Sequence, residues 1–233
     1  MAFKKLSIII PAFNEEATIA AIISKVRAAV LPNGLSREII VVDDGSTDGT
    51  SSIAQSLVAH DLVYLHQHNQ GKAGAIKAGF RQATGDILLI QDADLEYDPI
   101  QYPQLLQPII DGKTQVVYGS RFLGKIRDMH LVNHVANAIS NITFRLLWRV
   151  PLTDINTCYK VFTRQALEGI EIKTSQFALE TELTIKILLK GLSIFEIPIH
   201  YEARTRQEGK KIRWSTALEM FWPIIKHRFI RPQ

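Results

Sequence analysis

A short apolar run leads into a cluster of carboxylates in the sequence Gly85-Asp-Ile-Leu-Leu-Ile-Gln-Asp-Ala-Asp-Leu-Glu-Tyr-Asp-Pro99. The apolar run, residues 87–90, is too short for a buried helix and is bounded by glycine and proline, so it predicts a fully buried strand. Asp92 and Asp94 follow this strand directly. In an open α/β sheet, ligands bind beyond the carboxyl ends of the strands, so we expect both carboxylates in the active centre.

Two carboxylates separated by one residue can face one point. Hard oxygen ligands of this kind suit Mg²⁺ or Mn²⁺ carrying a substrate diphosphate. The alternative is a solvated acidic turn, because any surface loop can carry Asp-x-Asp. The other motifs of the chain bear on this choice.

The residues before this stretch repeat a strand-to-helix pattern, which predicts a parallel sheet. Pro11 is expected to end the first strand, because proline lacks the N–H that strand pairing needs. Asn14 is expected to cap the first helix. The expected strands are residues 6–10, 38–42 and 62–65, and the expected helices are residues 14–29, a segment ending at 57, and residues 72–83.

Polar loops follow these strands as well. Asp44, in Asp43-Asp-Gly-Ser-Thr-Asp-Gly-Thr50, can accept hydrogen bonds from a ribose or a base, whereas Asp43 is assigned a structural role. Turn formation alone is the alternative, because Asp, Gly, Ser and Thr are common turn residues. In Asn69-Gln-Gly-Lys72 a helix begins with a cation, and Lys72 with the backbone N–H groups is expected to contact phosphate.

Downstream of Pro99 we expect a helix over residues 100–110, with Pro103 in its first turn. A strand over residues 115–118 is expected to end in Gly119-Ser-Arg121. The fork of Arg121 is suited to clamp a diphosphate, and the alternative is an ion pair with Asp92 or Asp94. Residues 195–199 are expected to form an edge strand, because they contain Pro198.

From His130 onward, apolar residues recur at helical spacing beside asparagines and arginines. This pattern predicts an amphipathic helix that packs on the core or on lipid. The densest basic segment, residues 204–213, is expected to be a mobile loop that closes on anionic ligands. Residues 214–230 again combine aromatic and basic residues, which suits a membrane interface, and packing in a homo-oligomer is the alternative.

Composition limits the classes of function. The 233 residues include 27 basic and 23 acidic ones, a net charge of +4 that does not argue for nucleic acid. A single cysteine, Cys158, excludes an intramolecular disulfide and favours a reducing compartment. Met1-Ala-Phe-Lys-Lys lacks the layout of a signal peptide. No run approaches the roughly 18 apolar residues that span a bilayer. We therefore expect a cytoplasmic protein that lies on a membrane without crossing it.

The motifs, in their order, resemble those of family 2 glycosyltransferases, and most closely the dolichol-phosphate mannose and glucose synthase branch. The resemblance covers residues 5–213 and is carried by six segments: Pro11-Ala-Phe-Asn-Glu15, Asp43-Asp-Gly-Ser-Thr-Asp-Gly-Thr50, Asn69-Gln-Gly-Lys72, Asp92-Ala-Asp94, Gly119-Ser-Arg121 and Glu196-Ile-Pro198. It implies an α/β fold of the GT-A (Rossmann-like) type, with a mainly parallel central sheet and flanking helices, to which the sequence of this chain adds the expected C-terminal amphipathic helix. It also implies a divalent metal, a nucleoside-diphosphate sugar donor and inversion at the anomeric carbon.

The resemblance also implies roles for single residues. The nucleoside pocket would be lined by Pro11, Phe13, Glu15, Val42 and Asp44. The diphosphate would meet Asp92, Ala93 and Asp94, and the metal would bind Asp94 and Glu96. The donor and acceptor phosphates would be held by Arg121, Arg204 and Lys210. The family often has tyrosine at the position of Phe13, and its mannose synthases often have glutamine at that of Glu96, so guanine or uracil and mannose or glucose stay open.

The chemistry favours a phosphate acceptor. Departure of the diphosphate needs electrostatic stabilisation, which the metal on Asp94 with Arg121 would supply. An alcohol acceptor also needs a general base, for which Glu182 is the best candidate, although an ion pair is the expected role of that residue. A phosphate is already an anion and needs cations instead, which residues 204–213 offer.

We therefore expect transfer of a hexose to a polyprenyl phosphate by a domain of residues 1–213, followed by a membrane-interfacial helix of residues 214–233. One alternative is a glycosyltransferase acting on a saccharide or protein hydroxyl. Another is a noncatalytic nucleotide-sugar binding protein.

Overall fold

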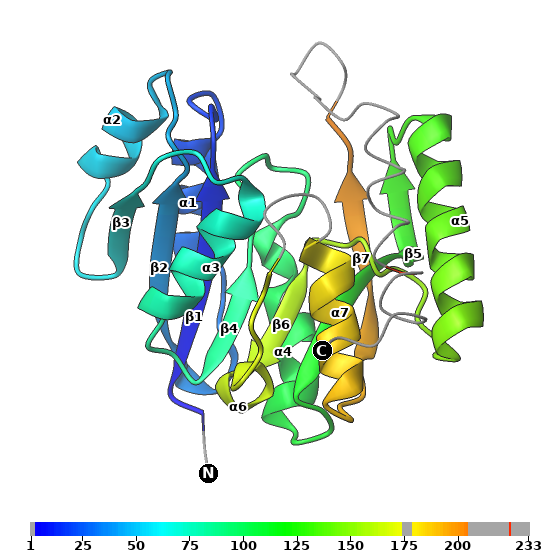
Figure 1. Ribbon diagram of the computed structural model, residues 1–233. Coiled ribbons are helices and arrows are strands. Elements are labelled where there is room, and N and C mark those ends of the chain that lie inside the picture. Colours follow the sequence, from blue (N-terminus) through cyan, green and yellow to red (C-terminus); the bar gives the residue numbers. More distant parts are fainter. Residues whose placement is uncertain (1–2, 174–178, 205–223, 225–233) are drawn as a thin grey trace.

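Seven strands form one sheet within the residues that the computed structural model describes, namely 3–173, 179–204 and 224, in the order β3-β2-β1-β4-β6-β5-β7 (Figure 1). The strands are β1 (Lys5–Ala12), β2 (Ser36–Asp43), β3 (Leu62–His66), β4 (Ile87–Ile90), β5 (Val116–Arg127), β6 (Lys160–Thr163) and β7 (Phe195–Glu202). Only β6 pairs antiparallel with its neighbours, and the other pairings are parallel. The predicted α/β fold with a mainly parallel central sheet is confirmed.

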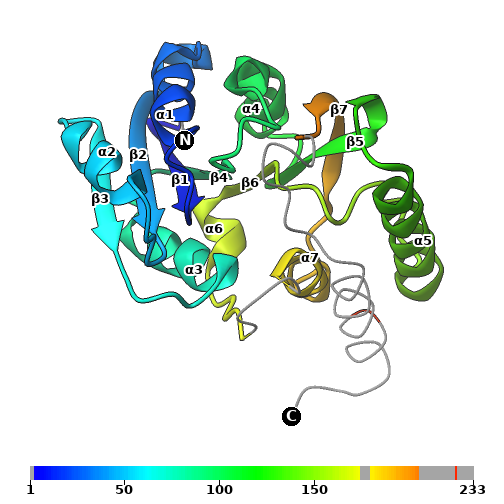
Figure 2. The same ribbon diagram turned by 90° about the horizontal axis from the view of Figure 1, so that it is seen from above.

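Helices cover both faces of the sheet. Figure 2 shows α1 and α4 on one face and α3, α6 and α7 on the other, while α5 lies outside, beside β5. The helices are α1 (Ile19–Ala28), α2 (Thr50–Ser56), α3 (Lys72–Gln82), α4 (Tyr102–Ile110), α5 (Leu131–Trp148), α6 (Arg164–Leu167) and α7 (Leu179–Leu189), with short 3-10 turns η1 (Pro32–Gly34) and η2 (Pro99–Gln101). Strands enclosed on both faces are apolar along their whole length, as the all-buried Ile87–Ile90 illustrates.

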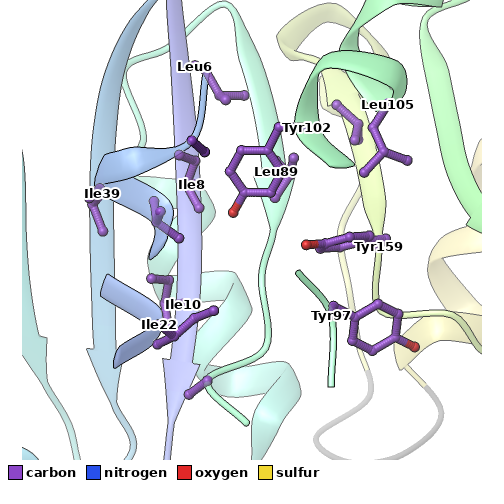
Figure 3. Packing of buried hydrophobic residues seen from close by; sticks show 14 of the residues in the cluster. Leu6, Ile8, Ile10, Ile22, Ile39, Leu89, Tyr97, Tyr102, Leu105 and Tyr159 are labelled. Carbon is purple, nitrogen blue, oxygen red and sulfur yellow. The ribbon is translucent and has the colours of Figure 1, made fainter. Parts of the chain in front are cut away.

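The largest core cluster fills the space between the sheet and the helices α1 and α4 (Figure 3). Alternate residues of one strand point to opposite faces. In β1, Ile8 and Ile10 therefore belong to this cluster, whereas Ile9 packs on the opposite side, against α3. Gly79 of α3 makes that packing possible, because a Cβ at this position would collide with the side chain of Ile9. Because β1, β2, β3 and β4 run parallel, their carboxyl ends lie at one common edge of the sheet.

The first strand and helix differ from the prediction. Strand β1 continues through Pro11 to Ala12. The proline is tolerated because it lies beyond Ile9, the last residue of β1 that pairs with β4, and is paired only with Val42 of β2. Asn14 does not cap α1. Its φ of 54° is left-handed, and α1 begins only after Thr18.

Strand β5 is also longer than predicted, so Arg121 lies within the strand and not at its end. Its pairing with β7 is interrupted between Ser120 and Lys125 by a register shift. Gly124 allows the two strands to approach there, because a Cβ would overlap the backbone of Ile199. Strand β7 is the last in the sheet order, which confirms the prediction of an edge strand around Pro198.

Helix α5 confirms the predicted amphipathic helix, but the side that it buries is partly polar. The buried residues are Ser140, Asn141 and Phe144. Ile224 packs against Phe144, and its carbonyl accepts a hydrogen bond from the Trp148 indole (3.4 Å). The apolar stripe faces outward and includes Leu131, Val132, Val135, Ile139, Ile142 and Leu146.

The expected mobile loop and C-terminal helix lie outside the described residues, apart from Arg204 and Ile224. Among the helices that the structure describes, none has both the length and the apolar character required to span a bilayer.

Candidate active site

The loop after β4 is held in place by a glutamine in the core. Gln91 follows β4 and is fully buried. Its side-chain oxygen accepts hydrogen bonds from the hydroxyls of Tyr102 (2.8 Å) and Tyr159 (2.9 Å), and its amide donates to the Tyr97 carbonyl (3.1 Å). Figure 3 shows these tyrosines gathered beside the sheet. Because a satisfied buried network is rigid, these bonds fix the path of residues 92–97.

Asp94 and Glu96 both turn toward Arg204. An Oδ2 to Nη2 distance of 3.2 Å separates Asp94 from the guanidinium, and Glu96 Oε1 accepts a hydrogen bond from the Arg204 backbone N–H (2.8 Å). The guanidinium also contacts both oxygens of Glu15, at 3.0 and 3.1 Å. Tyr201 donates its hydroxyl to Glu96 Oε2 (2.5 Å). The carboxylates of Glu15 and Asp94 therefore contact the guanidinium, while that of Glu96 is held by the Arg204 backbone and by Tyr201.

This cluster of Glu15, Asp94 and Glu96 is short of positive charge. Burial, with repulsion from Asp92 and Glu96, raises the pKa of Asp94 to about 7, although Arg204 opposes the shift. A pKa raised in this way indicates that another cation would be stabilised there.

The donor set also fits a hard divalent cation. Among the described residues, no group of three or more His, Cys, Asp or Glu side chains is arranged to hold a metal by itself. Mg²⁺ commonly takes only one or two protein carboxylates and completes its shell with water and substrate phosphates. The oxygens of Asp94 and Glu96 are the ones such a cation would use.

Asp92 faces a different cation, contrary to the expectation that both aspartates meet at one point. Its Oδ1 lies 2.8 Å from the ammonium of Lys72. The same ammonium is 3.4 Å from Glu180 Oε1 and 3.0 Å from the Cys158 sulfur. Lys72 is the first residue of α3, and its side chain is directed at Asp92. The intervening Ala93 is buried in the main core cluster.

Glu182, the candidate general base, is committed elsewhere. Its Oε1 is 2.6 Å from the ammonium of Lys186 and accepts a hydrogen bond from the Lys173 backbone N–H (2.8 Å). Glu180, two residues earlier in α7, is the carboxylate of this helix that reaches Lys72. Because residues two positions apart on a helix point to different sides, Glu182 pairs with Lys186 while Glu180 reaches the site.

The loops after β1 and β2 are tied together. The side-chain oxygen of Asn14 accepts a hydrogen bond from the Thr47 backbone N–H (2.8 Å), and the Asn14 backbone N–H donates to the Ser46 hydroxyl (3.0 Å). The backbone N–H of Glu15 donates to the Thr50 hydroxyl (2.8 Å). Asn14 therefore links the two loops by hydrogen bonds, which explains its left-handed backbone.

The residues expected around a nucleoside lie at these strand ends, with different exposures. Phe13 exposes 40% of its surface, whereas Val42 is fully buried in the core. Asp44 is also buried and accepts hydrogen bonds from the side-chain amide of Gln67 (2.6 Å) and the backbone N–H of Gln70 (2.9 Å). The edge brings together Pro11, Phe13, Glu15, Val42 and Asp44.

Arg121 forms an ion pair, but with neither Asp92 nor Asp94. Its Nε and Nη2 lie 2.7 and 2.8 Å from the two carboxylate oxygens of Asp154, and its guanidinium carbon lies 5.2 Å from the centre of the Tyr201 ring. Asp154 is fully buried in the loop before β6. Sequence reasoning missed it, and the only signal was its place in a polar loop that enters a strand.

Glu196 of β7 holds that loop. Its two oxygens accept hydrogen bonds from the backbone N–H groups of Thr153 (2.8 Å) and Asp154 (2.9 Å). Burial raises the pKa of Glu196, as expected of a carboxylate enclosed between two strands and a loop. Lys210, the remaining expected phosphate ligand, lies outside the described residues.

Comparison with known proteins gives this geometry a context. Residues 7–170 match the family model described as "Glycosyl transferase family 2". The chain is 29% identical over 216 residues to a dolichol-phosphate mannosyltransferase of Pyrococcus furiosus, covering 88% of this chain and 59% of that protein. It is 30% identical over 233 residues to a polyprenol monophosphomannose synthase of Mycolicibacterium smegmatis, covering 93% of this chain and 86% of that protein.

The fold is also found among solved structures. A glucosyl-3-phosphoglycerate synthase of Mycobacterium tuberculosis, in complex with Mn²⁺, UDP-glucose and glycerol 3-phosphate, has a TM-score of 0.74 at 20% identity. The alignment covers 99% of this chain and 82% of that structure. This likeness establishes the fold, an α/β arrangement of the GT-A type.

Proposed function

The chain belongs to glycosyl transferase family 2, and from this premise we propose that it transfers a hexose from a nucleoside-diphosphate sugar to a polyprenyl phosphate, with inversion at the anomeric carbon. The observation that carries the proposal is the group of carboxylates around Arg204 at the carboxyl ends of β1 and β4. Such a group suits a metal-bound diphosphate better than it suits any neutral ligand. Mannose and glucose are both candidate sugars.

In this proposal Asp94 and Glu96 hold Mg²⁺ or Mn²⁺. The metal, when bound, would neutralise the charge that develops on the departing diphosphate. The support from this chain is that a cation, the Arg204 guanidinium, already lies against Asp94, while Glu96 accepts a hydrogen bond from the Arg204 backbone N–H. The support from relatives is that the mycobacterial synthase was crystallised with Mn²⁺ or Mg²⁺ together with UDP.

The donor is proposed to lie along the strand ends. Exposed Phe13 would contact the base, and Asp44 would exchange a bond from Gln67 or Gln70 for one from the ribose. On the other side of the metal residues, Asp92 and Lys72 would face the hexose and the diphosphate. The proposed donor site is completed by Pro11, Glu15, Val42 and Ala93, which lie at or just beyond the carboxyl ends of β1, β2 and β4.

A phosphate acceptor is favoured because the site offers cations, while the two carboxylates considered as a base, within the described residues, are both paired. Asp92 is paired with Lys72, and Glu182 is paired with Lys186. An acceptor that is already ionised needs no proton removed before it attacks the anomeric carbon. Arg204 and Arg121, with Lys210 beyond the described residues, are the proposed phosphate ligands.

The outward face of α5 supports a lipid acceptor. Leu131 and Leu146 expose 73% and 75% of their surfaces, although both are large and apolar. Residues 129–153 contain no aspartate or glutamate, while Arg145 and Arg149 are exposed at the end of the helix. An apolar face with basic and no acidic neighbours suits an anionic membrane surface. A second copy of the chain would instead bring like charges together.

We therefore propose a protein that is peripheral on the cytoplasmic face of a membrane. The proposed division into a catalytic domain, residues 1–213, and an interfacial segment, residues 214–233, belongs to the same model.

The experiment is transfer by the purified chain with Mn²⁺ from radiolabelled GDP-mannose and UDP-glucose, with and without a short polyprenyl phosphate. The expected result is label that extracts into organic solvent only when the lipid is present, from one of the two donors. Donor hydrolysis without a lipid product would retain the transferase and reject the acceptor. No binding or turnover of either donor would reject the proposal.

A further inference from the structure

The contact between Arg204 and Asp94 involves an atom that a metal would need. Asp94 Oδ1 accepts the backbone N–H of Glu96 (3.1 Å), so Oδ2 is the oxygen that can project into the cluster. That oxygen lies 3.2 Å from Nη2 of Arg204. A guanidinium and a divalent ion cannot both lie against one carboxylate oxygen, because they repel each other and compete for the same lone pairs.

Arg204 is incompletely satisfied where it lies. Its Nε is buried and has no hydrogen-bond partner among the described residues. Buried donors are normally paired, so an orphan of this kind indicates a second arrangement or a missing ligand. The carboxylates satisfy the two outer nitrogens only.

We propose that Arg204 and the divalent metal are alternative occupants of one cation position, and that metal binding transfers Nη2 of Arg204 from Asp94 to the phosphate of the acceptor. The second half rests on the proposed function. Arg204 thereby determines both the affinity for the metal and the moment at which the acceptor site is complete.

Glu15 makes this transfer feasible. Its carboxylate binds both Nη1 and Nη2 of Arg204, and it belongs to the loop after β1, away from the loop that carries Asp94. Loss of the Asp94 contact therefore leaves the guanidinium attached to the site through Glu15. The freed side of Nη2, with the unpartnered Nε, is then available to phosphate oxygens.

The test of the first half is Mn²⁺ affinity without any nucleotide, measured from the electron paramagnetic resonance signal of free Mn²⁺. The apparent affinity for Mn²⁺ is the intrinsic affinity multiplied by the fraction of molecules in which Arg204 does not occupy the site. Arg204→Gln should therefore bind Mn²⁺ about tenfold more tightly than the wild type. The matched control is Lys25→Gln, which removes the same charge from an exposed ion pair with Asp98 and should change the affinity less than about twofold. Circular dichroism establishes that each variant is folded.

An unchanged or weaker Mn²⁺ affinity in folded Arg204→Gln would overturn the inference, and so would failure of all three proteins to bind Mn²⁺. Tighter binding in Arg204→Gln without any transfer to lipid would retain the shared cation position and reject the proposed acceptor.

The second half is tested by calorimetric titration of a short polyprenyl phosphate, with and without Mn²⁺. Mn²⁺ should tighten its binding to the wild type at least about fivefold, but not its binding to Arg204→Gln, because coupling between the two ligands requires the element that one displaces and the other binds. Equal enhancement in both proteins would show that the metal recruits the phosphate without Arg204 and would reject this half.

Discussion

Arg121 and Asp154 form a buried ion pair with two parallel contacts, 2.7 and 2.8 Å long, and the Arg121 backbone N–H donates to the same carboxylate at 3.0 Å. Breaking a buried pair leaves an uncompensated charge. Asp154→Ala should therefore lower the free energy of unfolding by about 3 to 5 kcal/mol, measured by urea denaturation. Lys113→Ala, which breaks an exposed pair with Asp111, should cost less than about 1 kcal/mol.

The double variant Arg121→Met/Asp154→Leu separates stability from function. Replacing both partners by apolar residues of similar volume should recover most of the lost stability. If Arg121 binds the diphosphate, transfer stays low in this folded variant. Full recovery of transfer would assign Arg121 a purely structural role.

Asp94→Ala should abolish Mn²⁺-dependent transfer, lowering kcat/KM by at least about a thousandfold, because the leaving diphosphate loses its electrostatic support. The comparison variant is Asp111→Ala, which removes an exposed carboxylate at the C-terminal end of α4. Turnover of Asp94→Ala near that of the comparison variant would remove Asp94 from the metal site.

The pKa of Asp94, raised to about 7, predicts two dependences on pH. A metal competes with the proton, so the Mn²⁺ affinity should fall about tenfold for each pH unit below 7. The folded-state pKa lies above the unfolded value, so the favourable contribution of Asp94 to stability is complete below about pH 4 and is lost as the pH rises through 7. Metal-free Asp94→Asn should therefore gain about 2 to 4 kcal/mol of stability relative to the wild type between pH 4 and pH 8. A stability difference between Asp94→Asn and the wild type that does not change with pH would contradict the raised pKa of Asp94.

Glu182→Gln should affect thermal stability, whereas Glu180→Gln should affect catalysis. The first breaks the pair with Lys186 and should reduce thermal stability while leaving kcat within about threefold. The second removes a carboxylate that helps to orient Lys72 beside Asp92, and should lower kcat/KM for the donor by about ten- to a hundredfold at unchanged stability. Steady-state kinetics and thermal melts on the same preparations compare them. A large loss of kcat in Glu182→Gln alone would revive the hydroxyl-acceptor alternative.

The apolar face of α5 can be tested with vesicles of phosphatidylcholine and phosphatidylglycerol. Ile142→Glu should weaken sedimentation with the vesicles at least about tenfold, because it places a charge in the proposed interface. Val58→Glu is the matched control, since Val58 is 52% exposed and Ile142 is 54% exposed, yet Val58 lies next to β3 at the other end of the sheet order. Equal binding of both variants would remove α5 from the membrane contact.

The sequence was most informative where one local pattern governs structure. Residues 87–90 were predicted to the residue as β4, because a short apolar run enclosed by turn residues has few alternatives. Helix α5 was predicted from its period, but the period could not tell which face is buried, since Ser140 and Asn141 bond to the 154–156 loop. These contacts span 14 and 16 residues, which is beyond the reach of a helical period.

The contacts of the candidate site were mostly beyond local patterns. Asp154 meets Arg121 across 33 residues, and Arg204 meets Glu15 across 189. Asn14 has the composition of a helix cap but links two loops instead, because Ser46 and Thr47 offer it better partners. Such choices are made by tertiary contacts, which override local preferences.

Gln91 ties the acidic loop to the cooperative folding unit of the domain. Surface loops commonly open by local fluctuations, and their amides exchange hydrogen quickly. Here the loop cannot detach from the sheet without breaking the bonds from the Gln91 amide to the Asp92 and Tyr97 carbonyls, and that amide is held in the core by Tyr102 and Tyr159. The amides of residues 92–97 should therefore exchange at rates set by global unfolding, as those of a central strand do.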